Sequence, residues 1–126
     1  MAEAETRRYA VDARSTDTFG RVLCSSREHH FVADGPVHNG CPGEALTPAE
    51  LFLAGVAACG VELLQVLARG EGLPLAAVRS AVSGEIDPGN PVRPDVTVVN
   101  RVRMRFELEG VTEEQGAELI DRFKAR

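Results

Sequence analysis

The feature that most limits how this chain can fold is a long, nearly uninterrupted apolar segment that begins at Pro48. Thr47, Pro48 and Glu50 supply an N-cap residue, a proline at the first helical position and the acid of a capping box. These signals predict that a helix begins here. We expect it to run to about Arg69, where glycines follow, over roughly 30 Å at 1.5 Å per residue.

Apolar side chains cover most of the circumference of this predicted helix. They are Leu51, Phe52, Leu53, Val56, Val61, Leu63, Leu64, Val66 and Leu67. A helix that is apolar all round must be buried all round. One small sheet cannot cover both sides, and the only other predicted helix is short. We therefore expect a homodimer in which the central helices pack against each other or against the partner's sheet.

Cys59 lies in the middle of this helix. A buried thiol is usually inert packing, but a thiol beside a positive charge can become a thiolate that attacks peroxides or disulfides. The helix N-terminus is too far away to supply that charge, so an arginine is the natural activating group. Glu50 could hold the arginine. On one helix Glu50 and Cys59 are nine residues apart, about 900° of rotation, and point to opposite sides. A site that uses both would draw them from different subunits or require a kink.

Composition and charge narrow the class of protein. The chain has 126 residues, 44% hydrophobic and 26% charged, which suits one soluble domain over residues 1–126. The start lacks a secretory signal, and three cysteines without regular spacing favour reduced thiols, so we expect a cytoplasmic protein. The net charge of -5 disfavours nucleic acid and anionic membranes as partners. Arg101, Arg103 and Arg105 form a basic stripe that we interpret as solvated ion pairing with neighbouring acids.

The remaining pattern predicts an α+β fold. We expect an antiparallel meander of three short strands, with a tight turn around Ser26 and Arg27 and an ordered loop after it. Two alternating, half-exposed strands joined as a hairpin come after the long helix. Thr112 and Gln115 then open a second helix, whose predicted apolar side is formed by Ala117, Ile120 and Phe123. The expected ranges are strands at 7–13, 20–25, 29–33, 78–87 and 101–109, with the first loop at 34–45 and the second at 87–95.

One stretch resembles a known family. Residues 26–64 read SREHHFVADGPVHNGCPGEALTPAELFLAGVAACGVELL. A strand ending in Val-x-Asp, a Gly/Pro loop, Thr-Pro-x-Glu-Leu and then Ala-Ala-Cys resemble the core of the OsmC/Ohr superfamily. The resemblance implies antiparallel sheets packed around a long central helix and an intertwined homodimer. It also implies thiol-dependent reduction of organic hydroperoxides with two cysteines and no cofactor.

The resemblance also suggests roles for particular residues. Cys59 matches the attacking cysteine, and Glu50 matches an acid that pairs with an arginine from the N-terminal strands. We prefer Arg21 for that arginine, with Arg27 in the hairpin and Arg14 as alternatives. The family's second cysteine follows the last helix, so we expect this single domain to lack the family's C-terminal segment. Cys24 and Cys41 are the substitutes within the sequence.

Other interpretations remain open at this point. Cys59 could be core packing in a non-catalytic dimer that binds a small apolar ligand, and Glu50 could serve only as a helix cap. If Phe19, Phe52 and Val56 line the pocket, they would favour organic over inorganic peroxides. The physiological thiol reductant is undetermined. A zinc site is disfavoured because the candidate ligands lack paired spacing; these ligands would be His29, His30, His38 and Cys41.

Overall fold

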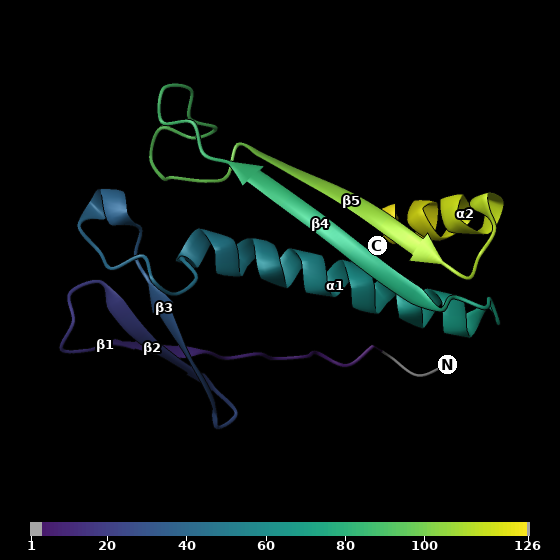
Figure 1. Ribbon diagram of the computed structural model, residues 1–126, viewed down its shortest axis with the longest axis horizontal. Coiled ribbons are helices and arrows are strands. Elements are labelled where there is room, and N and C mark those ends of the chain that lie inside the picture. Colours follow the sequence, from purple (N-terminus) through teal and green to yellow (C-terminus); the bar gives the residue numbers. More distant parts are fainter. Residues whose placement is uncertain (1–3, 126) are drawn as a thin grey trace. The chain divides into compact units, whose positions relative to one another are not determined.

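The computed structural model describes residues 4–125 and contains two antiparallel sheets and two α-helices, in agreement with the predicted α+β class (Figure 1). The elements are β1 (Asp12–Ser15), β2 (Arg21–Ser26), β3 (His29–Asp34), a short 3-10 turn (Val37–Asn39), α1 (Pro48–Gly70), β4 (Ala77–Glu85), β5 (Arg101–Glu109) and α2 (Glu113–Lys124). Contacts divide the chain into an N-terminal unit that ends at Leu51 and a C-terminal unit that begins at Phe52. The single domain stays a prediction.

The N-terminal unit is built on a three-stranded meander in the order β1, β2, β3. Arg27 and Glu28 form the tight turn between β2 and β3, and both have positive φ (49° and 67°), as a two-residue hairpin turn requires. The predicted turn was one residue too early. The predicted first strand at 7–13 was wrong in its bounds, because β1 pairs only as far as Asp12, which lies opposite Ser25 near the end of β2.

Asp34 fastens the loop that follows this meander. It is the buried charged residue of the described chain, with an exposed fraction of 0%. Its Oδ2 atom accepts hydrogen bonds from the backbone N–H groups of Glu44 (2.9 Å) and Ala45 (2.8 Å), and Arg21 donates to both carboxylate oxygens. These bonds, that from Arg21 above all, hold the pKa of Asp34 far below its usual range. A buried, ionised carboxylate therefore ties the loop to the end of β3.

The helix α1 begins as the sequence predicts. The Thr47 backbone N–H donates to Oε1 of Glu50 (2.9 Å), and the Glu50 N–H donates to Oγ1 of Thr47 (3.4 Å). These reciprocal bonds are the expected capping box. The helix ends at Gly70, one residue beyond the predicted end.

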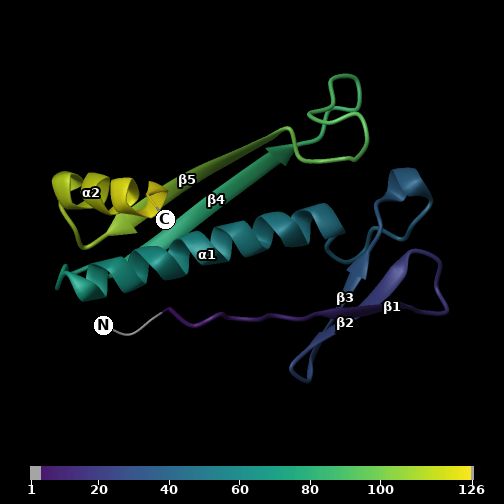
Figure 2. The same ribbon diagram turned by 180° about the vertical axis from the view of Figure 1, so that it is seen from behind.

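In the C-terminal unit, α1 packs against a hairpin of β4 and β5, with the sheet along one side of the helix (Figures 1 and 2). Two glycines permit a close approach. A Cβ at Gly60 would meet the Phe106 ring at 2.9 Å, and a Cβ at Gly84 would meet a methyl group of Leu53 at 3.0 Å. The hairpin confirms the two predicted strands and their antiparallel pairing.

The core of this unit lies where α2 meets the C-terminal half of α1. Leu64, Ala68 and Leu119 are buried together there. The predicted capping box of α2 is present. The buried residue of α2 is Leu119, whereas Ala117, predicted on the apolar side, is exposed. Half-buried apolar residues surround this core: Leu67, Leu73, Leu75, Val78, Phe106, Leu108, Ile120 and Phe123.

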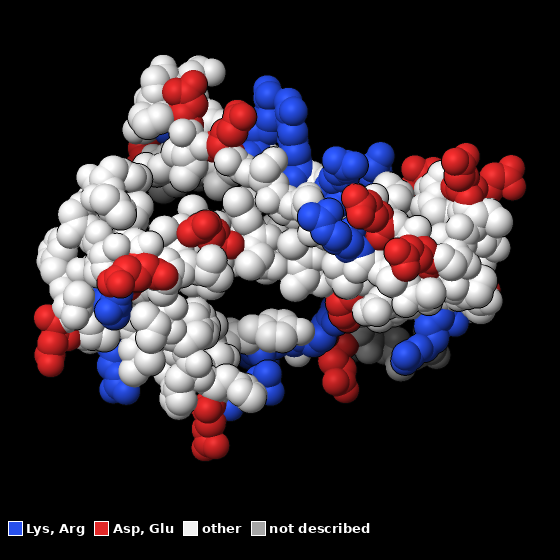
Figure 3. Space-filling model, in the orientation of Figure 1, with Lys and Arg blue, Asp and Glu red and all other residues white. Residues whose placement is uncertain are grey.

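On the exposed side of the hairpin, Arg105 is the member of the predicted basic stripe that pairs with a neighbouring acid among the described residues. Oε1 of Glu107 lies 3.6 Å from Nη1 of Arg79 and 3.8 Å from Nη2 of Arg105. Figure 3 shows acidic and basic side chains next to one another on this part of the surface. These exposed pairs contribute little to stability but keep the strand face solvated.

Within residues 4–125, α1 is the helix that is long and apolar enough to cross a membrane by length and composition. The core helix of a water-soluble protein meets the same criterion. Its buried residues, Gly60, Leu64 and Ala68, lie in the second half of the helix. Length and composition are therefore weak grounds for assigning a membrane location.

Replacing Leu64 by Ala should lower the free energy of unfolding by about 2–5 kcal/mol, because the side chain is fully buried and leaves a cavity. Urea unfolding followed by circular dichroism measures the change. Leu46→Ala is the matched control, since Leu46 is 51% exposed. Equal losses in the two variants would contradict the packing described for α1.

Acid should weaken the N-terminal unit through Asp34. A carboxylate with a depressed pKa stabilises the fold above its ordinary pKa of about 4, and this contribution is lost as the pH falls below that value. The stability advantage of the wild type over Asp34→Asn should thus be constant above about pH 5 and shrink below about pH 4. Amide hydrogen exchange at Glu44 and Ala45 across this range gives a local measurement. If the stability difference between the wild type and Asp34→Asn stayed unchanged down to about pH 2, the ionised Asp34 would not be what stabilises this unit.

Candidate functional site

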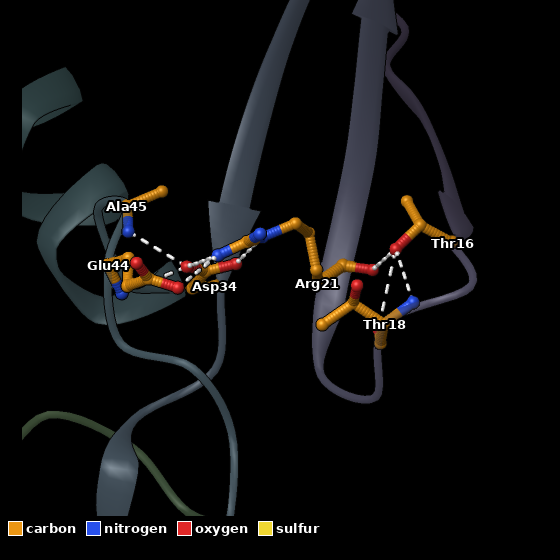
Figure 4. A network of polar contacts seen from close by, with 6 residues as sticks. All are labelled: Thr16, Thr18, Arg21, Asp34, Glu44 and Ala45. Atoms are coloured by element: carbon orange, nitrogen blue, oxygen red, sulfur yellow. Dashed lines mark hydrogen bonds and ion pairs between the residues drawn. The ribbon is translucent and has the colours of Figure 1, made fainter.

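Arg21 is fixed by both its backbone and its side chain. The register of β2 and β3 places Arg21 directly opposite Asp34, so both side chains lie on the same face of the sheet. The guanidinium binds the carboxylate through two parallel bonds, Nε to Oδ1 at 2.8 Å and Nη2 to Oδ2 at 2.9 Å (Figure 4). The backbone carbonyl of Arg21 accepts a hydrogen bond from Thr16 Oγ1 at 3.0 Å, and the backbone N–H of Arg21 donates one to the Thr18 carbonyl at 3.1 Å.

A second carboxylate also contacts this guanidinium. Arg21 Nη2 donates to Glu44 Oε1 at 3.0 Å. The Glu44 side chain is 76% exposed, so water competes for this contact, whereas Asp34 is shielded. The bonds to Asp34 and Glu44 raise the pKa of Arg21 further above its ordinary value, so its charge is permanent.

Glu50 has the capping role that the sequence predicts. Its Oε1 atom accepts bonds from both the N–H and the hydroxyl of Thr47, each at 2.9 Å, and these bonds lower the pKa of the Glu50 carboxyl. Within the described part of one chain, the carboxylates that hold Arg21 are Asp34 and Glu44. Within this part of one chain Glu50 contacts Thr47 rather than Arg21, and its expected pairing with an arginine stays a prediction for the assembled protein.

The alternative arginines are less organised. Arg27 is exposed in the hairpin turn with φ of 49°, and Arg14 is exposed on β1 opposite Leu23. Arg21 is the candidate whose guanidinium is held in one orientation.

Within one chain Cys59 is exposed on α1, and its expected burial in a homodimer stays a prediction. The β4–β5 hairpin lies along one side of the helix, and Phe52, Cys59 and Val66 lie on another, exposed side. Phe52, Cys59 and Val66 follow one another at seven-residue intervals, so they form one stripe along that side. Phe52 and Val66 are 55% and 50% exposed. We call Phe52, Cys59, Glu62 and Val66 the open face of α1; Glu62 is exposed, as predicted.

A cavity of about 320 Å³ begins one turn after Cys59. Its lining is Glu62, Gln65, Val66, Ala68, Arg69, Leu73 and Leu75. The thiol thus lies on an apolar stripe that leads toward a hollow containing one acid and one base.

The other two cysteines are also free. Cys24 is buried in β2, and Cys41 is half-buried in the loop, where its Sγ atom packs against Gly20 and Gly35. In the stretch from residue 4 to residue 125, no three His, Cys, Asp or Glu side chains gather closely enough to hold a metal ion.

Sequence reasoning missed Asp34 and Glu44. Asp34 could have been found, because counting back from a turn at residues 27 and 28 puts Arg21 opposite it. Glu44 lies in an irregular loop, and no sequence signal indicates where its side chain points.

Arg21 belongs to the N-terminal unit and Cys59 to the C-terminal unit. What the arrangement offers chemically is a permanent, oriented cation in one unit and an accessible thiol on an apolar surface in the other.

Solved structures share this fold. An OsmC-like protein from Mycoplasma pneumoniae matches with a TM-score of 0.81 and 18% identity, covering 97% of this chain and 84% of that one. An organic hydroperoxide resistance protein OsmC from Legionella pneumophila matches with a TM-score of 0.73 and 17% identity, covering 94% of this chain and 82% of that one. An organic hydroperoxide resistance protein from Elizabethkingia anophelis matches with a TM-score of 0.74 and 17% identity, and the shares of the two chains covered are the same. At such identities the likeness shows the fold alone.

Sequence comparison gives the family itself. No curated protein matches the chain in sequence. The sequence profile described as OsmC-like protein matches residues 41–126, which is more than half of the chain and includes α1 with Cys59. This chain therefore belongs to the OsmC-like protein family.

Proposed function

We propose that this protein reduces organic hydroperoxides with Cys59 as the reacting thiol. The observation that carries the proposal is the accessible thiol of Cys59 within an apolar stripe, which suits an organic substrate better than hydrogen peroxide. Family membership supports it, since two structural relatives are named organic hydroperoxide resistance proteins.

The reaction would begin with the Cys59 thiolate attacking the terminal oxygen of ROOH. A sulfur–oxygen bond forms, the O–O bond breaks, and the alkoxide leaves and takes up a proton as ROH. Cys59 becomes a sulfenic acid, oxidised by two electrons. One external thiol then condenses with it to a mixed disulfide and releases water, and a second thiol restores Cys59. No cofactor enters this cycle.

Arg21 is the proposed cation of the site. Its Nε and Nη2 are occupied, but Nη1 donates no hydrogen bond to any residue between 4 and 125. That N–H group can therefore stabilise a thiolate or a departing alkoxide. Glu50 would contribute by fixing the first turn of α1, and Arg27 is the alternative cation.

A second copy of the chain would complete the site. The open face of α1 exposes Phe52 and Val66 by half or more, which is unfavourable unless something covers them. We propose that the partner's α1 or sheet covers this face, so that Cys59 becomes sheltered and Glu50 and Cys59 can come from different subunits. The cytoplasm, which keeps thiols reduced, remains the expected location.

The competing function is a non-catalytic dimer that binds a small apolar ligand. The cavity beside Val66, with Leu73 and Leu75 in its lining, favours this reading. In such a dimer Cys59 would be packing, and it would alkylate no faster than free cysteine near pH 7.

Cys59→Ser should reduce the consumption of cumene hydroperoxide in the presence of dithiothreitol to the uncatalysed rate, because the nucleophile is lost. Arg21→Met should slow it by about 100- to 1,000-fold, the usual cost of removing a charge-stabilising donor. Cys24→Ser is the control and should keep most of the activity, since Cys24 is buried in β2. Equal rates for the wild type and Cys59→Ser would end the peroxidase proposal.

Val66→Glu should weaken dimerisation, raising the Kd by more than about 100-fold, because it would bury an unpaired charge in the interface. Val92→Glu is the matched control, since Val92 is 60% exposed in the loop between β4 and β5. Sedimentation at micromolar concentration measures both. A wild type that is monomeric there, or equal Kd values for both variants, would contradict this interface.

A further inference from the structure

The two carboxylates that contact Arg21 differ in their surroundings. Asp34 is fully buried, accepts four hydrogen bonds, and engages two nitrogen atoms of the guanidinium at once. Glu44 is 76% exposed and engages one nitrogen, Nη2. Two-point binding by a shielded carboxylate fixes the plane of a guanidinium, whereas a single exposed contact does not.

We propose that Asp34 is the positioning residue that orients Arg21 for the chemistry of Cys59, and that Glu44 is an exchangeable partner that an incoming anion replaces. This inference rests on the proposed peroxidase function. It assigns to Asp34 the task that the sequence gives to Glu50.

Contacts on both sides restrain Arg21 and Asp34. The β2–β3 register sets Arg21 against Asp34, and the backbone N–H groups of Glu44 and Ala45 keep the carboxylate from turning. Thr16 and Thr18 hold the backbone of Arg21 from the other side (Figure 4). These restraints leave the guanidinium little freedom to rotate. A charged group acts on a transition state only when it is held in place beforehand.

The charges make the two carboxylates separable by experiment. Arg21 and Asp34 together are neutral, and Glu44 adds one negative charge that opposes an approaching thiolate. If Asp34 acted through charge alone, Asp34→Asn would make Arg21 a stronger activator and speed the thiol. If it acts by positioning, the same change releases the guanidinium and slows the thiol. Glu44→Gln removes charge without removing the two-point contact.

The test is the rate at which Cys59 reacts with iodoacetamide, measured from pH 5 to pH 9 in the Cys24→Ser, Cys41→Ser background. Asp34→Asn should slow the reaction at pH 7 by at least about tenfold and move its pH profile upward, as Arg21→Met does. In the Arg21→Met background, Asp34→Asn should add no further loss. Glu44→Gln should react at the wild-type rate or faster.

Several results would overturn the inference. These are wild-type rates in Asp34→Asn, faster rates in it, wild-type rates in Arg21→Met, or a further loss in the double variant, which would indicate a structural role. Circular dichroism verifies that each variant folds. If Asp34→Asn does not fold, Arg21→Lys decides: Lys keeps the charge but cannot make the two-point contact, so positioning predicts the slow rate of Arg21→Met and charge alone predicts a rate near wild type.

Alkylation uses no peroxide, which separates this inference from the proposed function. A wild type that alkylates fast but consumes no cumene hydroperoxide would overturn the peroxidase reaction. The comparison of Asp34 and Arg21 variants would still decide the positioning role.

Discussion

The constraint on which the rest depends is that α1 is apolar on more sides than the β4–β5 hairpin and α2 cover. The β4–β5 hairpin and α2 bury Leu64 and Ala68 on one side. On the other side Phe52, Cys59 and Val66 remain exposed. We propose that a second copy packs on this exposed apolar surface, which also carries the accessible thiol, so the proposed assembly and the proposed chemistry share one side of one helix.

The N-terminal unit holds a charged arginine, Arg21, in one orientation. A buried carboxylate is costly unless its hydrogen bonds are satisfied, and Asp34 meets that cost with the bonds from Arg21 and from two backbone N–H groups. The carboxylate in turn restricts Arg21. Strand register, loop closure and the orientation of the guanidinium are thus set by one group of contacts.

Family membership and residue chemistry support the proposed reaction in different ways. The family profile covers α1 with Cys59, and the solved relatives show that the fold persists at 18% identity or less. Neither observation says which arginine or which acid acts in this chain. The assignments that we propose rest on the two bonds between Arg21 and Asp34 and on the capping box formed by Glu50.

The sequence by itself determined what depends on neighbouring residues. The capping boxes at Thr47 and Thr112, the extent of α1 and the alternating strands of the hairpin follow from local patterns that reach only a few residues. The tertiary structure decided which side of α1 is covered, that Leu119 rather than Ala117 is buried, and that Asp34 holds Arg21. These outcomes depend on strand register and on packing between distant segments, and both are settled only when the whole unit folds.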